Sequence, residues 1–299
     1  MPVLIAVAVA AVLVFIVLSI ATRRGAAPAP TGANVEHLIV VESERHPRFK
    51  QFLLERRDPK KATGLALTIA LGLATLTTLA IGLLLEMVQT NQGFARWDTA
   101  AARWGAAHSG GSAKEILIRV TTLGSTPFVA AVVLIVGVIE YRRLHTRAAP
   151  LFLVTVVLAE LALNNLVKAI VTRDRPDIHR VVHASGYSFP SGHTASTAAT
   201  YAAVALLLGS RRSRRAKAVL AGIAGALTVM VGASRVLLGA HWLTDVLAGA
   251  ALGWGVFALC SIAFGGRLLR FGEPVEEAQT KVVGGTSAGR SGHLSASAQ

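Results

Sequence analysis

Long apolar stretches constrain this chain more than any other feature of its sequence. Windows of about twenty residues with few interior charges recur along it, and one α-helix of that length crosses the hydrocarbon core of a bilayer. Of the 299 residues, 53% are apolar and 15% are charged, which excludes a typical soluble globule and a mainly disordered chain. Seven spanning helices are predicted, at residues 3–22, 62–87, 116–141, 149–171, 191–209, 218–239 and 241–264.

The predicted fold is an all-α, polytopic membrane helix bundle with a six-span core and one extra N-terminal span. The first apolar run has no basic residue before it and carries Arg23 and Arg24 after it. This favours a retained anchor, with cleavage as a signal peptide as the alternative. The expected parts are an anchor at 1–22, a cytoplasmic linker at 23–61, the core at 62–265 and a disordered cytoplasmic tail at 266–299, which is rich in Gly, Ser, Ala and Thr.

The net charge of +14 could indicate nucleic-acid binding, but the basic residues lie in short clusters between apolar runs. We therefore expect no nucleic-acid partner. Nine basic residues lie at 23–61, three at 142–147 and five at 211–217, which predicts that these segments are cytoplasmic. The opposite segments are poorer in positive charge apart from Arg173, Arg175 and Arg180, which need another explanation.

Ionisable residues near the ends of the predicted spans gather on one side of the bundle. Such residues are costly at membrane depth, so they mark a candidate site. His241 and Asp245 are one helical turn apart, so a carboxylate can lie beside an imidazole. The predicted orientation puts this side at the extracytoplasmic face of a cytoplasmic membrane. The group consists of Lys168, Arg175, Ser191, Gly192, His193, Arg235, His241 and Asp245.

The types of residue in this group suit phosphoryl chemistry. Lys168, Arg175 and Arg235 supply three cations, and two of them carry forked donors that match phosphate oxygens. Ser191 and Gly192 follow a proline at a helix start, where free backbone amides favour an anion. The sequence therefore predicts a phosphate-binding site built from several helix ends.

Three motifs in this order resemble the type-2 phosphatidic acid phosphatase and vanadium haloperoxidase superfamily, in its membrane lipid phosphatase branch. The first is Lys168, six residues, then Arg175-Pro176, and the second is Pro190-Ser191-Gly192-His193. The third is Ser234-Arg235, five residues, His241, three residues, Asp245. The resemblance covers roughly residues 65–264 and leaves out the first span and the tail.

The resemblance implies a role for each motif residue. It implies that His241 attacks phosphorus to form a phosphohistidine, that Asp245 orients His241, and that His193 protonates the leaving oxygen and later activates water. The cations would replace the magnesium used elsewhere, so we expect no metal and no cofactor. The single cysteine, Cys260, also excludes a disulfide within the chain and a cysteine-based zinc site.

Each residue also has a structural interpretation. Taken alone, the cations could anchor headgroups, Ser191 could be only a helix cap, and His241 could simply pair with Asp245. Glu160 and Asn164 are expected to support Lys168 from successive helical turns. Polar residues at Thr121, Thr122, Gly124 and Ser125 predict a kink or close packing, and Gly249 with Gly253 predicts close helix contact.

The predicted function is a membrane phosphatase acting on a lipid phosphate or diphosphate, with undecaprenyl or another polyprenyl diphosphate preferred. Phosphatidic acid and phosphatidylglycerophosphate are the alternative substrates. A lipid phosphotransferase and a non-catalytic lipid-phosphate binder remain alternative classes, whereas the apolar spans disfavour a soluble vanadate-dependent haloperoxidase. The expected partners are the lipid substrate and membrane lipids, and the oligomeric state is left open.

Overall fold

The computed structural model describes residues 59–178, 181–182, 185–210 and 212–268. Within these ranges the chain is helical and contains no strand, which confirms the all-α prediction. The predicted anchor, most of the predicted linker and most of the predicted tail lie outside the described residues.

Four helices among the described residues are long and apolar enough to cross a membrane. Their bounds agree with the predicted spans to within a few residues, because an apolar window maps directly onto a helix that faces lipid. They are α4 Pro59–Thr90, α8 Ala148–Val171, α10 Arg214–Leu237 and α11 Leu243–Leu268.

The span predicted at 116–141 is broken within its length. The segment forms two helices, α6 Gly111–Thr122 and α7 Thr126–Leu144, which meet at a bend of 49°. A tight turn separates them, in which Gly124 and Ser125 donate backbone hydrogen bonds to the carbonyls of Thr121 and Thr122. A proline in the first turn of α7 favours a new helix start. The interruption falls at the polar residues where a kink was predicted.

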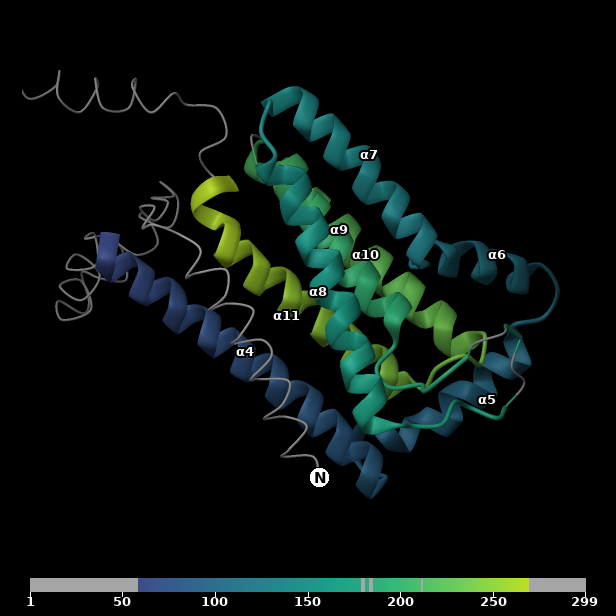
Figure 1. Ribbon diagram of the computed structural model, residues 1–299. Helices are drawn as coiled ribbons and strands as arrows, with labels where there is room; N and C mark the ends of the chain where they lie inside the picture. Colours follow the sequence, from purple (N-terminus) through teal and green to yellow (C-terminus); the bar gives the residue numbers. More distant parts are fainter. Residues whose placement is uncertain (1–58, 179–180, 183–184, 211, 269–299) are drawn as a thin grey trace, which may run out of the picture.

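Helix α9, Gly192–Gly209, is the inner helix of the bundle (Figure 1). It packs against α7, α8, α10 and α11, and most of its side chains are buried. It is less apolar than the four spanning helices and does not qualify as a span by composition. By length and composition, the described residues hold four spanning helices, or five if the bent pair counts as one, and α7, α8, α10 and α11 pack against α9. A helix surrounded by protein can carry threonine and alanine where a lipid-facing helix needs large apolar residues.

Glycines bring α11 against α9. A Cβ atom at Gly249 would lie 2.5 Å from the carbonyl oxygen of Ser191, and one at Gly253 would overlap the carbonyl oxygen of Ala195. Only glycine permits this approach. The predicted close contact at this pair is confirmed.

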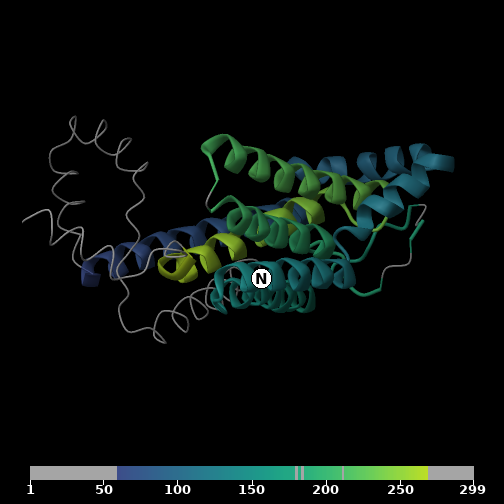
Figure 2. The same ribbon diagram turned by 90° about the horizontal axis from the view of Figure 1, so that it is seen from above.

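The short helices η2 Gly93–Trp97 and α5 Asp98–His108 connect α4 to α6. Figures 1 and 2 show α5 and α6 together at one end of the bundle. Gly105 of α5 lies against the backbone of Leu237, where a Cβ atom would be 2.8 Å from the Leu237 Cα. This end of the bundle is therefore capped by short helices packed across the end of α10.

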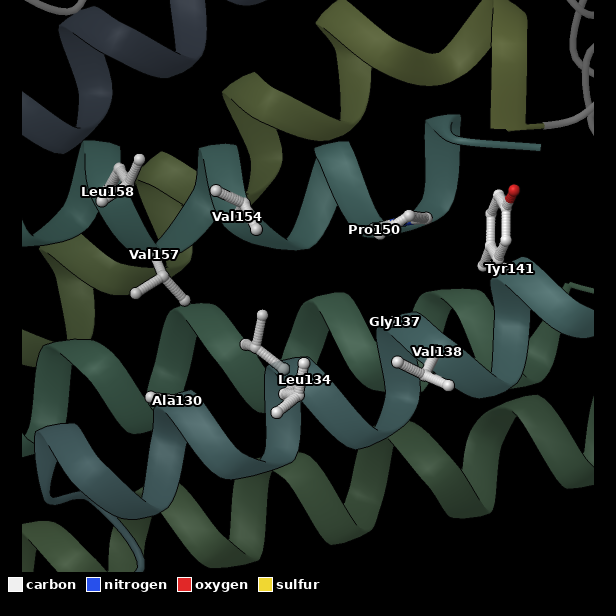
Figure 3. Close-up of a pocket in the computed structure, with 10 residues that line it drawn as sticks. Ala130, Leu134, Gly137, Val138, Tyr141, Pro150, Val154, Val157 and Leu158 are labelled. Atoms are coloured by element: carbon white, nitrogen blue, oxygen red, sulfur yellow. The ribbon is translucent and has the colours of Figure 1, made fainter.

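An apolar groove of about 430 Å³ runs between α7 and α8 (Figure 3). Leu134, Val138, Val154 and Leu158 line it, and Tyr141 lies at one end. Its lining suits hydrocarbon and includes none of the motif residues. This groove is therefore not the candidate site.

We predict that Gly253→Ala destabilises the bundle, because the new methyl group must displace the α9 backbone. Overpacking of this kind typically costs about 1–3 kcal/mol. Gly222→Ala is the matched control, since a Cβ atom there meets nothing within 4 Å and alanine is the better helix former. Thermal denaturation in detergent should give a lower midpoint for the first variant only. Equal midpoints would contradict the packing argument.

Candidate functional site

The motif residues meet at one end of the bundle, where α8 and α10 end and α9 and α11 begin. The backbone N–H of Ser191 donates to the carbonyl of Asp245 at 2.9 Å, which joins the start of α9 to α11. The backbone N–H of His241 donates to the carbonyl of Arg235 at 3.2 Å, which holds the turn between α10 and α11. The three motifs are thus brought together as the sequence predicted.

His241 lies in the turn before α11 and is 2% exposed. Its Nδ1 lies 3.5 Å from Oδ2 of Asp245, longer than a good hydrogen bond, and its Nε2 lies 3.1 Å from Nη1 of Arg175. Burial lowers the pKa of the imidazole to about 4, although the nearby Asp245 carboxylate acts to raise it. At neutral pH the ring is therefore uncharged, and its Nε2 side faces a cation.

Asp245 is fully buried and both its oxygens have partners. Oδ2 accepts from the backbone N–H of Trp242 at 2.9 Å, and Oδ1 pairs with the guanidinium of Arg173. The positive charge of Arg173, which needed an explanation beyond topology, is turned into the protein, and only 16% of its side chain is exposed. Its role is to pair with buried carboxylates.

Sequence reasoning missed Asp98 and Thr244, which also contact Arg173. Nη2 of Arg173 donates to Oδ2 of Asp98 at 2.7 Å, and Nη1 donates to the Thr244 hydroxyl at 2.7 Å. The excess positive charge of the connection after α8 was the one signal in the sequence that pointed to such a role for Arg173. Asp98 gave no spacing signal, because it lies 75 residues away from its partner.

Arg175 and Lys168 meet at the connection between α8 and α9. Nζ of Lys168 and Nη2 of Arg175 both donate to the carbonyl of Tyr187, at 2.9 and 3.2 Å. Arg175 donates further to three other carbonyls. They belong to Ser185, Gly186 and Ala240.

Arg235, in the last turn of α10, is buried, and its Nη1 donates to the hydroxyl of Thr121 on α6 at 3.1 Å. Its Nε is buried with no hydrogen-bond partner among the described residues. Buried donors nearly always have an acceptor, so an unpaired donor on a cation indicates an anion-binding position. Thr121 was predicted only as part of a helix break, and here it also orients a site cation.

The start of α9 supplies backbone donors. Ser191 occupies the N-cap position of α9 as predicted, without a side-chain cap bond, and its hydroxyl accepts from Thr194 at 3.0 Å. The first amides of an α-helix, here at Gly192 and His193, have no intrahelical acceptor and favour an anion. His193 interacts electrostatically with Lys168, Arg175, Arg235 and His241, so it belongs to the same cluster.

Two buried polar residues of α8 lie below this cluster and face α9. Oε2 of Glu160 accepts from the hydroxyl of Ser196 at 2.7 Å, and Oδ1 of Asn164 lies 3.4 Å from the Cβ position at Gly192. Glu160 also interacts electrostatically with Lys168. Support of Lys168 by these residues stays a prediction, since their closest partners are on α9.

The assembled group can bind a tetrahedral anion and attack it. It combines a neutral buried imidazole, a second histidine, three cations and a helix start. Among the described residues, no group of three or more His, Cys, Asp or Glu side chains is arranged to hold a metal ion. The three cations of the site suit an anion as the ligand.

Comparisons with known proteins agree with this geometry. Residues 149–268 match the model of the PAP2 superfamily. A phosphatidylglycerophosphatase B from Bacillus subtilis is 36% identical over 162 residues, which cover 52% of this chain and 77% of that protein. A lipid A 1-phosphatase from Rhizobium etli is 36% identical over 38% of this chain and 52% of that protein.

A solved structure gives the same result for the fold. The crystal structure of a transmembrane PAP2-type phosphatidylglycerolphosphate phosphatase from Bacillus subtilis is 31% identical, with a TM-score of 0.59. The match covers 62% of this chain and 92% of that one. The family model, the curated relative and the shared fold together establish that this chain belongs to the PAP2 superfamily.

Proposed function

We propose that this protein is a membrane phosphatase that removes phosphate from a lipid phosphate, with His241 as the nucleophile. The observation that carries the proposal is the environment of the His241 ring. Asp245 lies on its Nδ1 side, which leaves Nε2 to attack, and Arg175 lies 3.1 Å from Nε2. A cation at the attacking nitrogen holds a phosphoryl group beside it.

The first chemical step transfers the phosphoryl group to the enzyme. Nε2 of His241 forms a bond to phosphorus while the bond from phosphorus to the lipid oxygen breaks. His193 donates a proton to that oxygen, so the lipid leaves as an alcohol, or as a monophosphate if the substrate is a diphosphate. Asp245 stabilises the positive charge that develops on the His241 ring, as the carboxylate of a catalytic triad does.

The second step restores the enzyme. His193, now neutral, accepts a proton from a water molecule, whose oxygen attacks phosphorus as the bond to Nε2 breaks. The products are inorganic phosphate and neutral His241. Cations surround His193, and the negative charge of a bound phosphoryl group offsets them, which favours the protonated acid form needed in the first step.

The cations stabilise the transition state. In phosphoryl transfer, most of the catalysis comes from positioning and from neutralising charge on the equatorial oxygens. Lys168, Arg175 and Arg235 approach from three different elements, and the amides at the start of α9 approach from a fourth. Such an array supplies donors around the phosphoryl group without a metal ion.

A lipid substrate follows from the location of the site. The cluster lies where spanning helices end, so a substrate can present its headgroup while its tail stays in the bilayer. The basic residues at 142–147 and 212–217 lie at the opposite ends of the helices, which supports a site on the extracytoplasmic face of the cytoplasmic membrane.

The relatives favour phosphatidylglycerophosphate as the first substrate to test, because the relative matched over 77% of its length is a phosphatidylglycerophosphatase. A polyprenyl diphosphate, preferred from the sequence, and phosphatidic acid belong in the same panel. The contacts of the site recognise the phosphate group rather than the lipid tail, so all three lipids can undergo the same phosphoryl transfer.

Phosphate release by the purified protein from this lipid panel tests the proposed function. We expect release from at least one lipid, and His241→Asn should reduce its rate by about 10⁴-fold or more, as loss of a catalytic nucleophile does. His145→Asn is the matched control, because His145 is exposed at the opposite end of α7 and asparagine tolerates its left-handed backbone. Unchanged release by His241→Asn would remove the assigned nucleophile.

We predict that the loss caused by His193→Asn depends on the leaving group. A lipid alkoxide needs a proton to leave, so loss of the general acid should reduce the rate of phosphoenzyme formation by about 10²–10⁴-fold. An aryl phosphate with an acidic phenol leaves without that proton, so its first step should be nearly unaffected. Acid-labile phosphohistidine should then accumulate, and mass spectrometry should locate it at His241. Equal losses for both substrates would contradict the role of His193.

Phosphatase activity should persist in excess EDTA, because the cations perform the charge neutralisation that magnesium supplies elsewhere. Initial rates before and after chelation, with and without added Mg²⁺, check this expectation, and we expect them to agree within about twofold. A strict requirement for a divalent metal would count against the cation cluster as the main source of charge stabilisation.

A further inference from the structure

Arg173 lies between acceptors from two elements that are distant in sequence. Its Nη2 donates to Oδ2 of Asp98 on α5, and its Nη1 donates to Asp245 and to the hydroxyl of Thr244, both on α11. Arg173 itself follows the end of α8. One guanidinium therefore bridges α5 and α11 just outside the cluster that holds His241.

Asp98 has its own partners in this network. It is 3% exposed, and its Oδ1 accepts from the backbone N–H of Thr244 at 2.9 Å while its Oδ2 accepts from the Thr244 hydroxyl at 2.7 Å. A buried carboxylate is stable only when it is paired and hydrogen-bonded, and here both oxygens meet those conditions. Asp98 thus fixes Arg173 and the first turn of α11 together.

The helix that carries Asp98 lies outside the residues 149–268 that match the family model. It is nevertheless held firmly, because Gly105 places it in close contact with the end of α10. Helix α5 lies at one end of the bundle (Figure 1), where Asp98 contacts Arg173 and Thr244. The arrangement indicates that the site depends on a segment before the family domain.

We propose that Asp98 is a positioning residue that acts through Arg173 to hold Asp245, and therefore His241, in the geometry for attack. This inference rests on the proposed phosphatase function. Asp98 contacts Arg173 and Thr244, so its effect on His241 passes through the Arg173–Asp245 pair.

The two carboxylates also set the charge next to His241. If Asp245 alone faced Arg173, the guanidinium would cancel its charge. Because Asp98 shares Arg173, the trio keeps one net negative charge, which can stabilise the positive His241 ring formed during attack. The charged and titratable groups around His241 are Asp245 from α11, Arg173 and Arg175 from the connection after α8, His193 from α9 and Arg235 from α10.

The first test compares Asp98→Asn with Glu115→Gln. Glu115 is exposed on α6 and has no contact with the network, so its variant removes the same charge from the same end of the bundle. We expect Asp98→Asn to lower kcat by about 10- to 100-fold, the usual effect of losing an outer-shell partner, with KM nearly unchanged. Asp98→Glu, which keeps the charge, should recover part of the loss. Equal kcat for Asp98→Asn and Glu115→Gln would overturn the proposal.

The second test uses the pH dependence of kcat/KM. Arg173→Gln removes the cation and leaves two carboxylates beside His241, which favours the protonated ring. The acid limb of the pH profile of kcat/KM should therefore move to higher pH by about one unit. Adding Asp98→Asn to that variant removes one of those carboxylates, so the limb should move back towards the wild-type position. A purely structural role would not produce this compensation. If the acid limb of the kcat/KM profile lies at the same pH in the wild type and in both variants, the proposal is overturned.

The same variants separate misfolding from mispositioning. Arg173→Gln should melt below the wild type, and the double variant should melt above Arg173→Gln, because it no longer buries two unpaired carboxylates. Additive losses of stability would count against the network. If the wild type releases no phosphate from any lipid, the proposed function fails and this inference fails with it. If the wild type is active and Asp98→Asn matches its control, only the inference fails.

Discussion

The ion pair between Arg173 and Asp245 links the separate parts of the chain that form the site. Arg173 follows α8, Asp245 lies in the first turn of α11, and Asp98, which shares the arginine, begins α5. Buried charges are tolerated only with a partner, and removing one member of such a group typically costs about 3–5 kcal/mol. The three elements therefore cannot take their positions independently. His241 lies one turn before Asp245 at the same end of the bundle, so the contacts of Asp245 also fix its position.

Packing and electrostatics act on the same residue of α11. The glycines of α11 allow its backbone to lie against α9, and at this contact the carbonyl of Asp245 accepts the backbone N–H of Ser191. The side chain of Asp245 meanwhile faces His241 and Arg173. One residue thus anchors the amide-rich start of α9 through its backbone and the proposed nucleophile through its carboxylate. A shift of α11 along α9 would disturb both the anion-binding turn and the imidazole.

The sequence predicted the helices that face lipid and the residues that gather at their ends. It did so because apolar length and fixed motif spacing are local properties. It also predicted a kink or close packing at Thr121–Ser125, and the turn between α6 and α7 lies there. Helix α9 falls below the apolar composition of the four spanning helices, because burial against other helices relaxes the demand for large apolar side chains. Asp98 and Thr244 could not be found, because their importance comes from contacts made only in the folded chain. The burial of Arg173 was hidden for the same reason.

Arg173 and Arg175 show how two neighbouring cations acquire different functions. They lie two residues apart in the non-helical connection after α8. Their partners Asp245 and His241 lie four residues apart, in the first turn of α11 and in the turn before it. Arg173 pairs with the carboxylates of Asp98 and Asp245, whereas Arg175 lies beside Nε2 of His241 and donates to the carbonyl of Ala240. The two cations therefore act on opposite sides of the proposed nucleophile, the first on its Nδ1 side through Asp245 and the second at Nε2.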